Sequence, residues 1–332
     1  MPIEAHRIAW HGRADGVAVK TFMPRFPRHV PLVRRDGEWA ADLYLPDDAR
    51  VEYRLEIRRG SRYESTLDPS NPEVATNPFG ENSVLYGTRY PARPPDSPAI
   101  AWRMREFRVQ STVFGGRRHH HLLSPAGLED REELPLLLLH DGSDYRNHAG
   151  LTPRLGAAIQ SGRLPFMRVA LLDPRHRNVE YVADANHASH VAHEVLLHLS
   201  SRIGVGSQRI LGGASLGAVA SWHAAWAHPG VFTGLVLQSG TFAFSGDGLL
   251  SRAMAAPIRS FLADAFVEPR LDQLGIGQTC GRYESLIDWN RTIAHRLADT
   301  AAFHRYEERW TGHDWGAWSD TLVGALAASL TR

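Results

Sequence analysis

Cysteine is nearly absent from this chain: Cys280 is the only one among 332 residues. A disulfide within the chain is therefore impossible, which is typical of reducing compartments and predicts a cytoplasmic location. Long apolar runs are also lacking, since no stretch reaches the roughly 18 apolar residues that a membrane span needs. The first residues, MPIEAHRIAWHGRADG, do not contain the apolar core of a signal peptide. We expect neither membrane insertion nor secretion.

Lysine is as rare as cysteine. Lys20 is the only lysine, so arginine supplies nearly all of the 37 basic side chains, which balance 36 acidic ones to a formal net charge of +1. That balance argues against a dedicated nucleic-acid-binding protein, which carries a basic surplus. Hydrophobic residues (43%) and charged residues (22%) occur at the levels of ordinary globular proteins. The composition thus excludes a mainly disordered chain.

Prolines concentrate in one segment, residues 91–98, where four occur in eight positions. Such a segment favours extended, semi-rigid chain, so we predict a linker there. Before it, apolar and polar residues alternate over 17–22, 39–45 and 51–57, with turn signals between these runs. The alternation predicts short strands and a small β-sandwich over residues 1–90.

After the linker, residues 99–332 show a different pattern. Glycines 115 and 116 mark the turn of a predicted hairpin. Strands that are apolar on both faces belong in a sheet covered on both sides, and their alternation with helices predicts an α/β domain with a mainly parallel sheet. The predicted hairpin strands are 106–113 and 119–123, the apolar strands are 134–139, 169–172, 209–211 and 234–237, and the helices are 187–203 and 218–227.

The segment Gly213-Ala-Ser215-Leu-Gly217 contains the pattern G-x-S-x-G. An apolar strand precedes it and a helix of small residues follows, which is the setting of a nucleophile elbow. Ser215 would then expose its hydroxyl at a helix N-terminus, where the helix dipole favours developing negative charge. The alternative is a glycine-rich turn with a capping serine. We interpret Ser215 as the nucleophile.

A serine nucleophile needs a base, and the chain has 18 histidines. The run His119–His121 lies on a predicted strand that splits its side chains between two faces, and histidines 187, 190 and 193 lack further nearby ligands, so we predict no metal site. His313 lies after a predicted strand at 303–310 and before the terminal helix. The base of a hydrolase of this kind occupies such a loop, last in the chain order serine, acid, histidine.

The acid must lie between Ser215 and His313. Glu284 follows a short strand and a turn, and Asp288 is one helical turn further on. Asp314, beside the base, is a weaker candidate. Glu284 could instead be a charge at a helix N-terminus and Asp288 part of a solvated helix face, so both remain candidates.

These segments together resemble the enterochelin (ferric siderophore) esterases and their relatives in the esterase D-like and feruloyl esterase group of α/β-hydrolases. The resemblance covers nearly all of the second domain, and the box around His313 is its most specific piece. In the first domain it extends to Leu67-Asp68-Pro69-Ser-Asn71-Pro72. The motifs of the second domain are Leu138-Leu-His-Asp141-Gly142, Arg177-Asn-Val-Glu180-Tyr181, Gly213-Ala-Ser-Leu-Gly217, Cys280-Gly-Arg-Tyr-Glu284 and Gly312-His-Asp-Trp315-Gly-Ala-Trp318.

The resemblance implies an α/β-hydrolase fold preceded by an immunoglobulin-like β-sandwich, and no cofactor. It assigns the triad to Ser215, Glu284 and His313. The oxyanion hole would use the amide of Leu216 and one from the turn that contains Gly142 and Ser143.

The implied activity is hydrolysis of a carboxylic ester through an acyl-enzyme, with a small-molecule ester such as a catecholate siderophore as substrate. Trp315, Trp318 and Arg177 would contact an aromatic or anionic acyl group, although Trp318 is equally expected in the core. The alternatives are a feruloyl or acetyl carbohydrate esterase, an acyltransferase, or an inactive esterase fold that only binds. A complete set of Ser215, Glu284 and His313 argues against the inactive fold.

Overall fold

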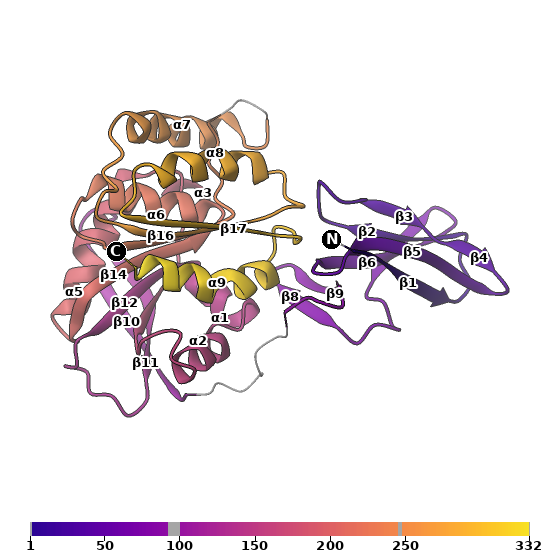
Figure 1. The fold of residues 1–332 in the computed structure, drawn as a ribbon, viewed down its shortest axis with the longest axis horizontal. Helices are drawn as coiled ribbons and strands as arrows, with labels where there is room; N and C mark the ends of the chain where they lie inside the picture. Colours follow the sequence, from indigo (N-terminus) through magenta and orange to yellow (C-terminus); the bar gives the residue numbers. More distant parts are fainter. Residues whose placement is uncertain (1, 92–99, 245–247, 332) are drawn as a thin grey trace. The chain divides into compact units, whose positions relative to one another are not determined.

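The computed structural model describes residues 2–91, 100–244 and 248–331, which form two compact units (Figure 1). The first unit combines the N-terminal strands with two later segments, Gly281–Ile287 and Glu308–Ala317, and the second contains the remainder of the chain. Of the predicted linker at 91–98, only Pro91 lies within the described residues.

The N-terminal strands form two antiparallel sheets with an apolar core. Alternation places Val51, Tyr53, Leu55 and Ile57 on one side of their strand, each at most 3% exposed. This confirms a small β-sandwich. One sheet has the order β1 (Ile3–His11), β5 (Glu38–Pro46), β4 (Val33–Arg35), and the other β3 (His29–Pro31), β2 (Gly16–Thr21), β6 (Arg50–Arg59), β9 (Gly80–Tyr86), β8 (Val74–Asn77), with β7 (Arg62–Thr66) paired to β6.

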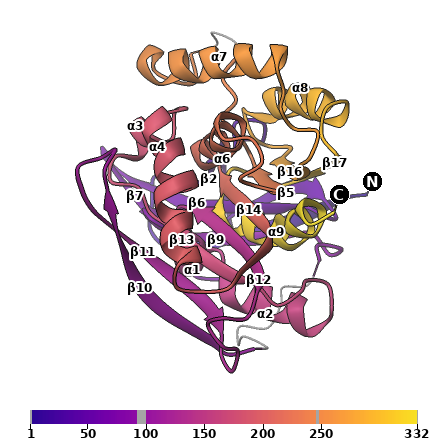
Figure 2. The ribbon, with the colours of Figure 1, turned by 90° about the vertical axis from the view of Figure 1, so that its left-hand side faces the viewer.

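The second unit is built on an eight-stranded sheet (Figure 2). The predicted hairpin is present, since Ser111 pairs with Gly116 at its turn. The strands from β13 to β16 pair in parallel, which confirms the mainly parallel α/β sheet. The order is β10 (Trp102–Ser111), β11 (Gly116–Pro125), β13 (Arg168–Leu172), β12 (Leu134–His140), β14 (Val205–Ala214), β15 (Gly234–Gln238), β16 (Gly275–Gly281), β17 (Phe303–Arg309).

Helices pack on the sheet in two groups (Figure 2). In the first, Tyr145 of α1 donates a hydrogen bond to Gln238 of β15 at 2.7 Å, and Gln238 donates to the carbonyl of Trp318 in α9 at 2.8 Å. In the second, α6 packs on β14 and β15 and against α4 and α7. The first group is α1 (Gly142–His148), α2 (Leu151–Gln160) and α9 (Trp315–Ser329), and the others are α3 (Arg177–Glu180), α4 (Ala185–Ser189), α5 (Leu196–Ser200), α6 (Leu216–Ala227), α7 (Arg252–Val267) and α8 (Ile287–Ala298).

The helix predicted over 187–203 is not one regular α-helix. A π-helical segment, η1 (His190–Val195), separates α4 from α5, and the helical residues end at Ser200. Within it Nδ1 of His190 lies 2.6 Å from Glu194, whose other carboxylate oxygen accepts the amide of Thr112 at 2.6 Å. The π-helical segment thus lies where polar contacts reach the start of the β10–β11 turn. The periodicity of apolar residues does not reveal such contacts.

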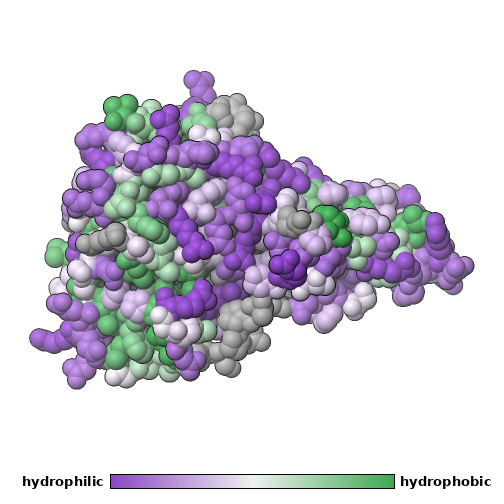
Figure 3. All heavy atoms as spheres, in the orientation of Figure 1, coloured by the Kyte–Doolittle hydropathy of each residue, from purple (hydrophilic) through white to green (hydrophobic). Residues whose placement is uncertain are grey.

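No helix among the described residues is long and apolar enough to cross a membrane. On the face shown in Figure 3, hydrophilic residues lie between the hydrophobic ones over much of the surface.

Buried histidines predict how the stability depends on pH. Burial lowers the pKa of His120 to about 3 and those of His223 and His304 to about 4. Because unfolded histidine titrates near pH 6.5, the unfolded chain binds more protons below that pH. As the pH falls from about 6.5 towards the folded pKa, His120 and His223, the two that are buried, should each remove about 1.4 kcal/mol of the free energy of unfolding per pH unit, and the partly exposed His304 less.

Glu52 acts in the opposite direction, since burial raises its pKa to about 7, and it offsets one histidine. Urea unfolding followed by circular dichroism should therefore give a free energy that falls steadily from pH 7 to pH 5. His120→Phe should reduce that slope. A stability that does not change over this range would contradict the assignment.

Candidate active site

Ser215 lies in a tight turn between β14 and α6. Its backbone has φ 59° and ψ −120°, which non-glycine residues rarely adopt. A Cβ on Gly213 would lie 2.8–3.0 Å from the backbone of Gly217, so the chain can make this turn only if residue 213 is glycine. The strain and the close approach are those of a nucleophile elbow, as the sequence predicts.

Contacts from the end of β15 hold the Ser215 side chain and backbone. The amide of Ser215 donates to the carbonyl of Gln238 at 2.8 Å, and the amide of Thr241 donates to the carbonyl of Ser215 at 3.2 Å. The hydroxyls of Ser215 and Thr241 are 3.0 Å apart. Thr241 has no sequence motif of its own and is a site residue that the sequence did not reveal.

The turn after β12 supplies a second element of the site. Gly142 packs so closely on β13 that a Cβ there would come within 2.4 Å of the Cα of Leu171, so only glycine fits. The amide of Ser143 donates to the carboxylate of Asp173 at 3.1 Å, and the Ser143 hydroxyl bonds the same group. A substrate oxygen would have to compete with Asp173 for that amide. The Leu216 amide opens helix α6, where a helix has no internal acceptor for it.

Arg177 contacts this turn through Asp141. Its Nε lies 2.9–3.0 Å from both oxygens of Asp141, and its Nη2 lies 2.7 Å from Oδ2. Burial raises the pKa of Asp141, and the Arg177 guanidinium opposes that rise. Asp141 itself has a positive φ of 53°. Two nitrogens of Arg177 are therefore committed to the turn, while its side chain remains 38% exposed.

His140 joins this turn to the elbow. Its Nδ1 lies 3.0 Å from the Ser221 hydroxyl and 3.2 Å from the carbonyl of Gly212. Because Ser221 donates its own proton to Gly217, His140 must carry its proton on Nδ1. Its Nε2 then accepts from His187 at 2.9 Å, and burial holds the pKa of His140 well below its usual value. Neither histidine was predicted as a site residue.

Glu284 and His313 form a hydrogen-bonded pair in the first unit. Oε2 of Glu284 lies 2.7 Å from Nδ1 of His313, and Oε1 accepts the amide of Gly281 at 2.8 Å. The Glu284 side chain is fully buried, whereas that of His313 is 34% exposed. Asp288, the rival acid, is exposed on α8 and lies 3.8 Å from Arg291. The geometry therefore favours Glu284 as the partner of His313.

The two tryptophans near His313 differ in burial. Trp318 is 7% exposed, and its indole donates to the Ser239 hydroxyl at 2.9 Å. This fits the alternative that Trp318 packs in the core. Trp315 is half-buried at the first position of α9, so it is more exposed than Trp318.

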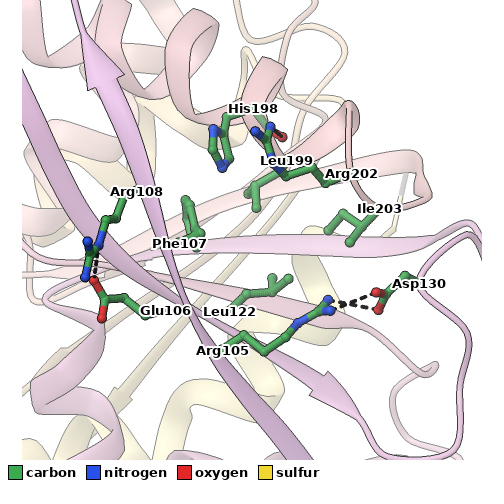
Figure 4. Close-up of a pocket in the computed structure, with 10 residues that line it drawn as sticks. All are labelled: Arg105, Glu106, Phe107, Arg108, Leu122, Asp130, His198, Leu199, Arg202 and Ile203. Atoms are coloured by element: carbon green, nitrogen blue, oxygen red, sulfur yellow. Dashed lines mark hydrogen bonds and ion pairs between the residues drawn. The ribbon is translucent and has the colours of Figure 1, made fainter.

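A groove of about 680 Å³ lies along the outermost strand β10 (Figure 4). Phe107 stacks on His198 in it, and Arg105 pairs with Asp130 at 2.8–2.9 Å. Ile203, also in its wall, lies just before β14, whereas Ser215 follows the other end of that strand. The groove therefore does not contain Ser215. Its lining is Arg105, Glu106, Phe107, Arg108, Leu122, Asp130, His198, Leu199, Arg202 and Ile203.

Within the described part of the chain, no group of three or more histidine, cysteine, aspartate or glutamate side chains is arranged to hold a metal ion. The reactive groups that the candidate site contains are a serine hydroxyl, a histidine–carboxylate pair and backbone amides.

Comparison with known proteins agrees with these features. The family model described as "Putative esterase" matches residues 111–329. No curated protein matches the chain.

Solved structures show the same fold. Ferric enterobactin esterase from Salmonella typhimurium is 17% identical with a TM-score of 0.78, covering 98% of this chain and 95% of that one. The enterobactin esterase of Shigella flexneri, solved in the presence of enterobactin, is 18% identical with a TM-score of 0.76 and the same coverage. A feruloyl esterase module from Clostridium thermocellum, complexed with sinapinate, is 15% identical with a TM-score of 0.52, covering 72% of this chain and 95% of that one. At these identities the likeness establishes the α/β-hydrolase fold alone.

The two candidate acids can be separated by substitution. Glu284→Gln removes the carboxylate bonded to His313 and should lower kcat for an aryl ester by about tenfold to a hundredfold. Asp288→Asn, the matched control on the exposed face of α8, should change kcat by less than about twofold, since surface substitutions perturb little. Steady-state kinetics on both folded variants decides. A larger loss in Asp288→Asn would reverse the assignment.

Proposed function

Because the chain belongs to the "Putative esterase" family, we propose that it is a serine esterase in which Ser215, His313 and Glu284 form the triad. The observation that supports this proposal is the strained backbone of Ser215 in the tight turn between β14 and α6, because strain of this kind is typical of catalytic sites. The order of the strands in the sheet supports this proposal. Ser215 and Glu284 follow β14 and β16, which pair in parallel with the same strand β15, and His313 follows the neighbouring β17.

In the proposed reaction, Nε2 of His313 takes the proton of Ser215 as its Oγ bonds to the ester carbonyl carbon. Glu284, bonded to Nδ1, stabilises the imidazolium that forms. The proton then passes to the departing alcohol as the C–O bond breaks, which leaves an acyl-enzyme. Water, deprotonated by His313, releases the acid and restores Ser215.

The amides of Leu216 and Gly142 are the proposed donors to the oxyanion of the tetrahedral intermediates, with Ser143 the weaker candidate because Asp173 occupies its amide. Backbone donors of this kind contribute roughly 3–4 kcal/mol each to transition-state stabilisation.

For the substrate we propose an ester of an aromatic acid, first of all a catecholate of the siderophore type. Trp315 and the exposed part of Arg177 are the groups that support an aromatic or anionic acyl part. The alternatives are a feruloyl or acetyl ester of a carbohydrate, or transfer of the acyl group to an alcohol. We expect the reaction in the cytoplasm, without a cofactor.

Substitution of the nucleophile and the base tests the proposal. Ser215→Ala and His313→Ala should each lower kcat for an aryl ester by about a thousandfold or more while near-ultraviolet circular dichroism stays unchanged. The double variant should lose little more than either single variant, because triad members act as a unit. Asp288→Asn, on the exposed face of α8, is the control and should cost much less. Full activity in Ser215→Ala would refute the serine mechanism.

Substrate class is tested by kcat/KM on a catecholate ester, a feruloyl ester and a long-chain fatty ester. We expect the aromatic esters to be preferred by about tenfold or more, since an indole and a guanidinium suit a flat anionic group. Trp315→Ala should reduce that preference, whereas Trp318→Phe, in the core, should not. A clear preference for the fatty ester would contradict the substrate proposal.

A further inference from the structure

The segments that carry Glu284 and His313 belong to the same compact unit as the N-terminal strands, and several contacts join them. The amide of Arg25 donates to the carbonyl of Tyr283 at 3.1 Å, and the ring of Phe26 lies 4.9 Å from that of Tyr283. On the other segment, the amide of Arg50 donates to the carbonyl of Trp310 at 2.9 Å. The N-terminal domain thus contacts both loops of the proposed acid–base pair, through the turn between β2 and β3 and through the start of β6.

Arg50, the first residue of β6, makes the most specific of these contacts. Its side chain is 2% exposed, although arginine is seldom buried unless it is paired. Nη1 bonds the carboxylate of Asp314, and Nη2 bonds Glu52 at 2.8 Å. A Cβ on Gly316 would come within 2.1–2.7 Å of the guanidinium atoms, so the guanidinium packs directly against the backbone that follows His313.

Asp314 connects this arginine to the start of α9. Its Oδ1, which bonds Arg50, also accepts the amide of Ala317 at 2.8 Å. Glu52 is held in turn by the amide group of Asn82 at 2.8 Å. Burial of Glu52 beside Asp314 raises the pKa of Glu52 to about 7, and Arg50 opposes that rise. Without the guanidinium, two carboxylates would lie in a buried place with no cation between them, and the bond that ties Asp314 to β6 would be lost.

We propose that Arg50 is a positioning residue for the catalytic base: through Asp314 and the backbone at Gly316 it fixes the loop that holds His313 in place. The N-terminal β-sandwich is then part of the catalytic apparatus. This inference rests on the proposed function, since it needs His313 to be the base. A displacement of about 1 Å in a catalytic group can lower a rate a hundredfold, so the effect is measurable.

The test is a double-substitution cycle on kcat with an aryl ester. Arg50→Met and Asp314→Asn should each lower kcat by about tenfold or more and change KM by less than about threefold, since they displace the base rather than a substrate contact. If Arg50 acts through Asp314, the double variant should be about as slow as the slower single variant. Arg50→Lys, which keeps the charge, should recover part of kcat.

The matched control is Arg168→Met. Arg168 is a second buried arginine, 1% exposed, which bonds carbonyls of Glu132, Gly204 and Glu129 at 2.7 Å in the other unit. The Arg168→Met variant should be less stable than the wild-type protein, but at a temperature where it is folded its kcat should stay within about twofold.

The positioning role would be overturned if Arg50→Met folds and keeps its kcat. It would also be overturned if the two fold-losses in kcat multiply in the double variant. Should Arg50→Met not fold, Arg50→Lys and Asp314→Asn decide alone, and unchanged kcat in both overturns it. These failures differ from failure of the proposed function, in which the wild-type protein and Arg168→Met would themselves show no hydrolysis.

Discussion

The close approach of Gly213 to Gly217 is the constraint on which the candidate site depends. It lets the chain turn from β14 into α6 within a few residues and forces Ser215 to a φ of 59°. That backbone places the serine at the start of the helix, beside the Leu216 amide, where the helix dipole favours an anion. A Cβ at position 213 would remove this geometry whatever the rest of the site contained.

Two polar networks keep the surrounding turns in place, one in each unit. In the second unit, His140 links the Gly142 turn to the elbow through Gly212 and Ser221, while Arg177 holds Asp141. In the first unit, the guanidinium of Arg50 holds the loop of His313. Buried polar groups of this kind are costly unless satisfied, so each network favours one arrangement of its turn. The turns of the candidate site thus depend on side chains that come from other strands and helices.

A feature can be predicted from the sequence when the residues that form it lie close together in the chain. Some strands in each of the three sheets, the hairpin at Gly115 and the tight turn around Ser215 depend on neighbours in sequence, so periodicity and small-residue spacing predicted them. The bonds of His140 to Ser221 and of Arg50 to Asp314 join residues 81 and 264 positions apart. No local pattern carries such pairings. The packing of the Arg50 guanidinium against Gly316 is visible only in the structure.

The central claim is that Ser215 is an activated nucleophile, and labelling with a fluorophosphonate followed by peptide mass spectrometry tests it most directly. A fluorophosphonate reacts with a serine only where a base and an oxyanion hole activate it. The account predicts one phosphonyl group per folded chain, on the peptide that contains Ser215, and none on the heat-denatured protein. A folded protein that acquires no label, or acquires it on another residue, would contradict the account.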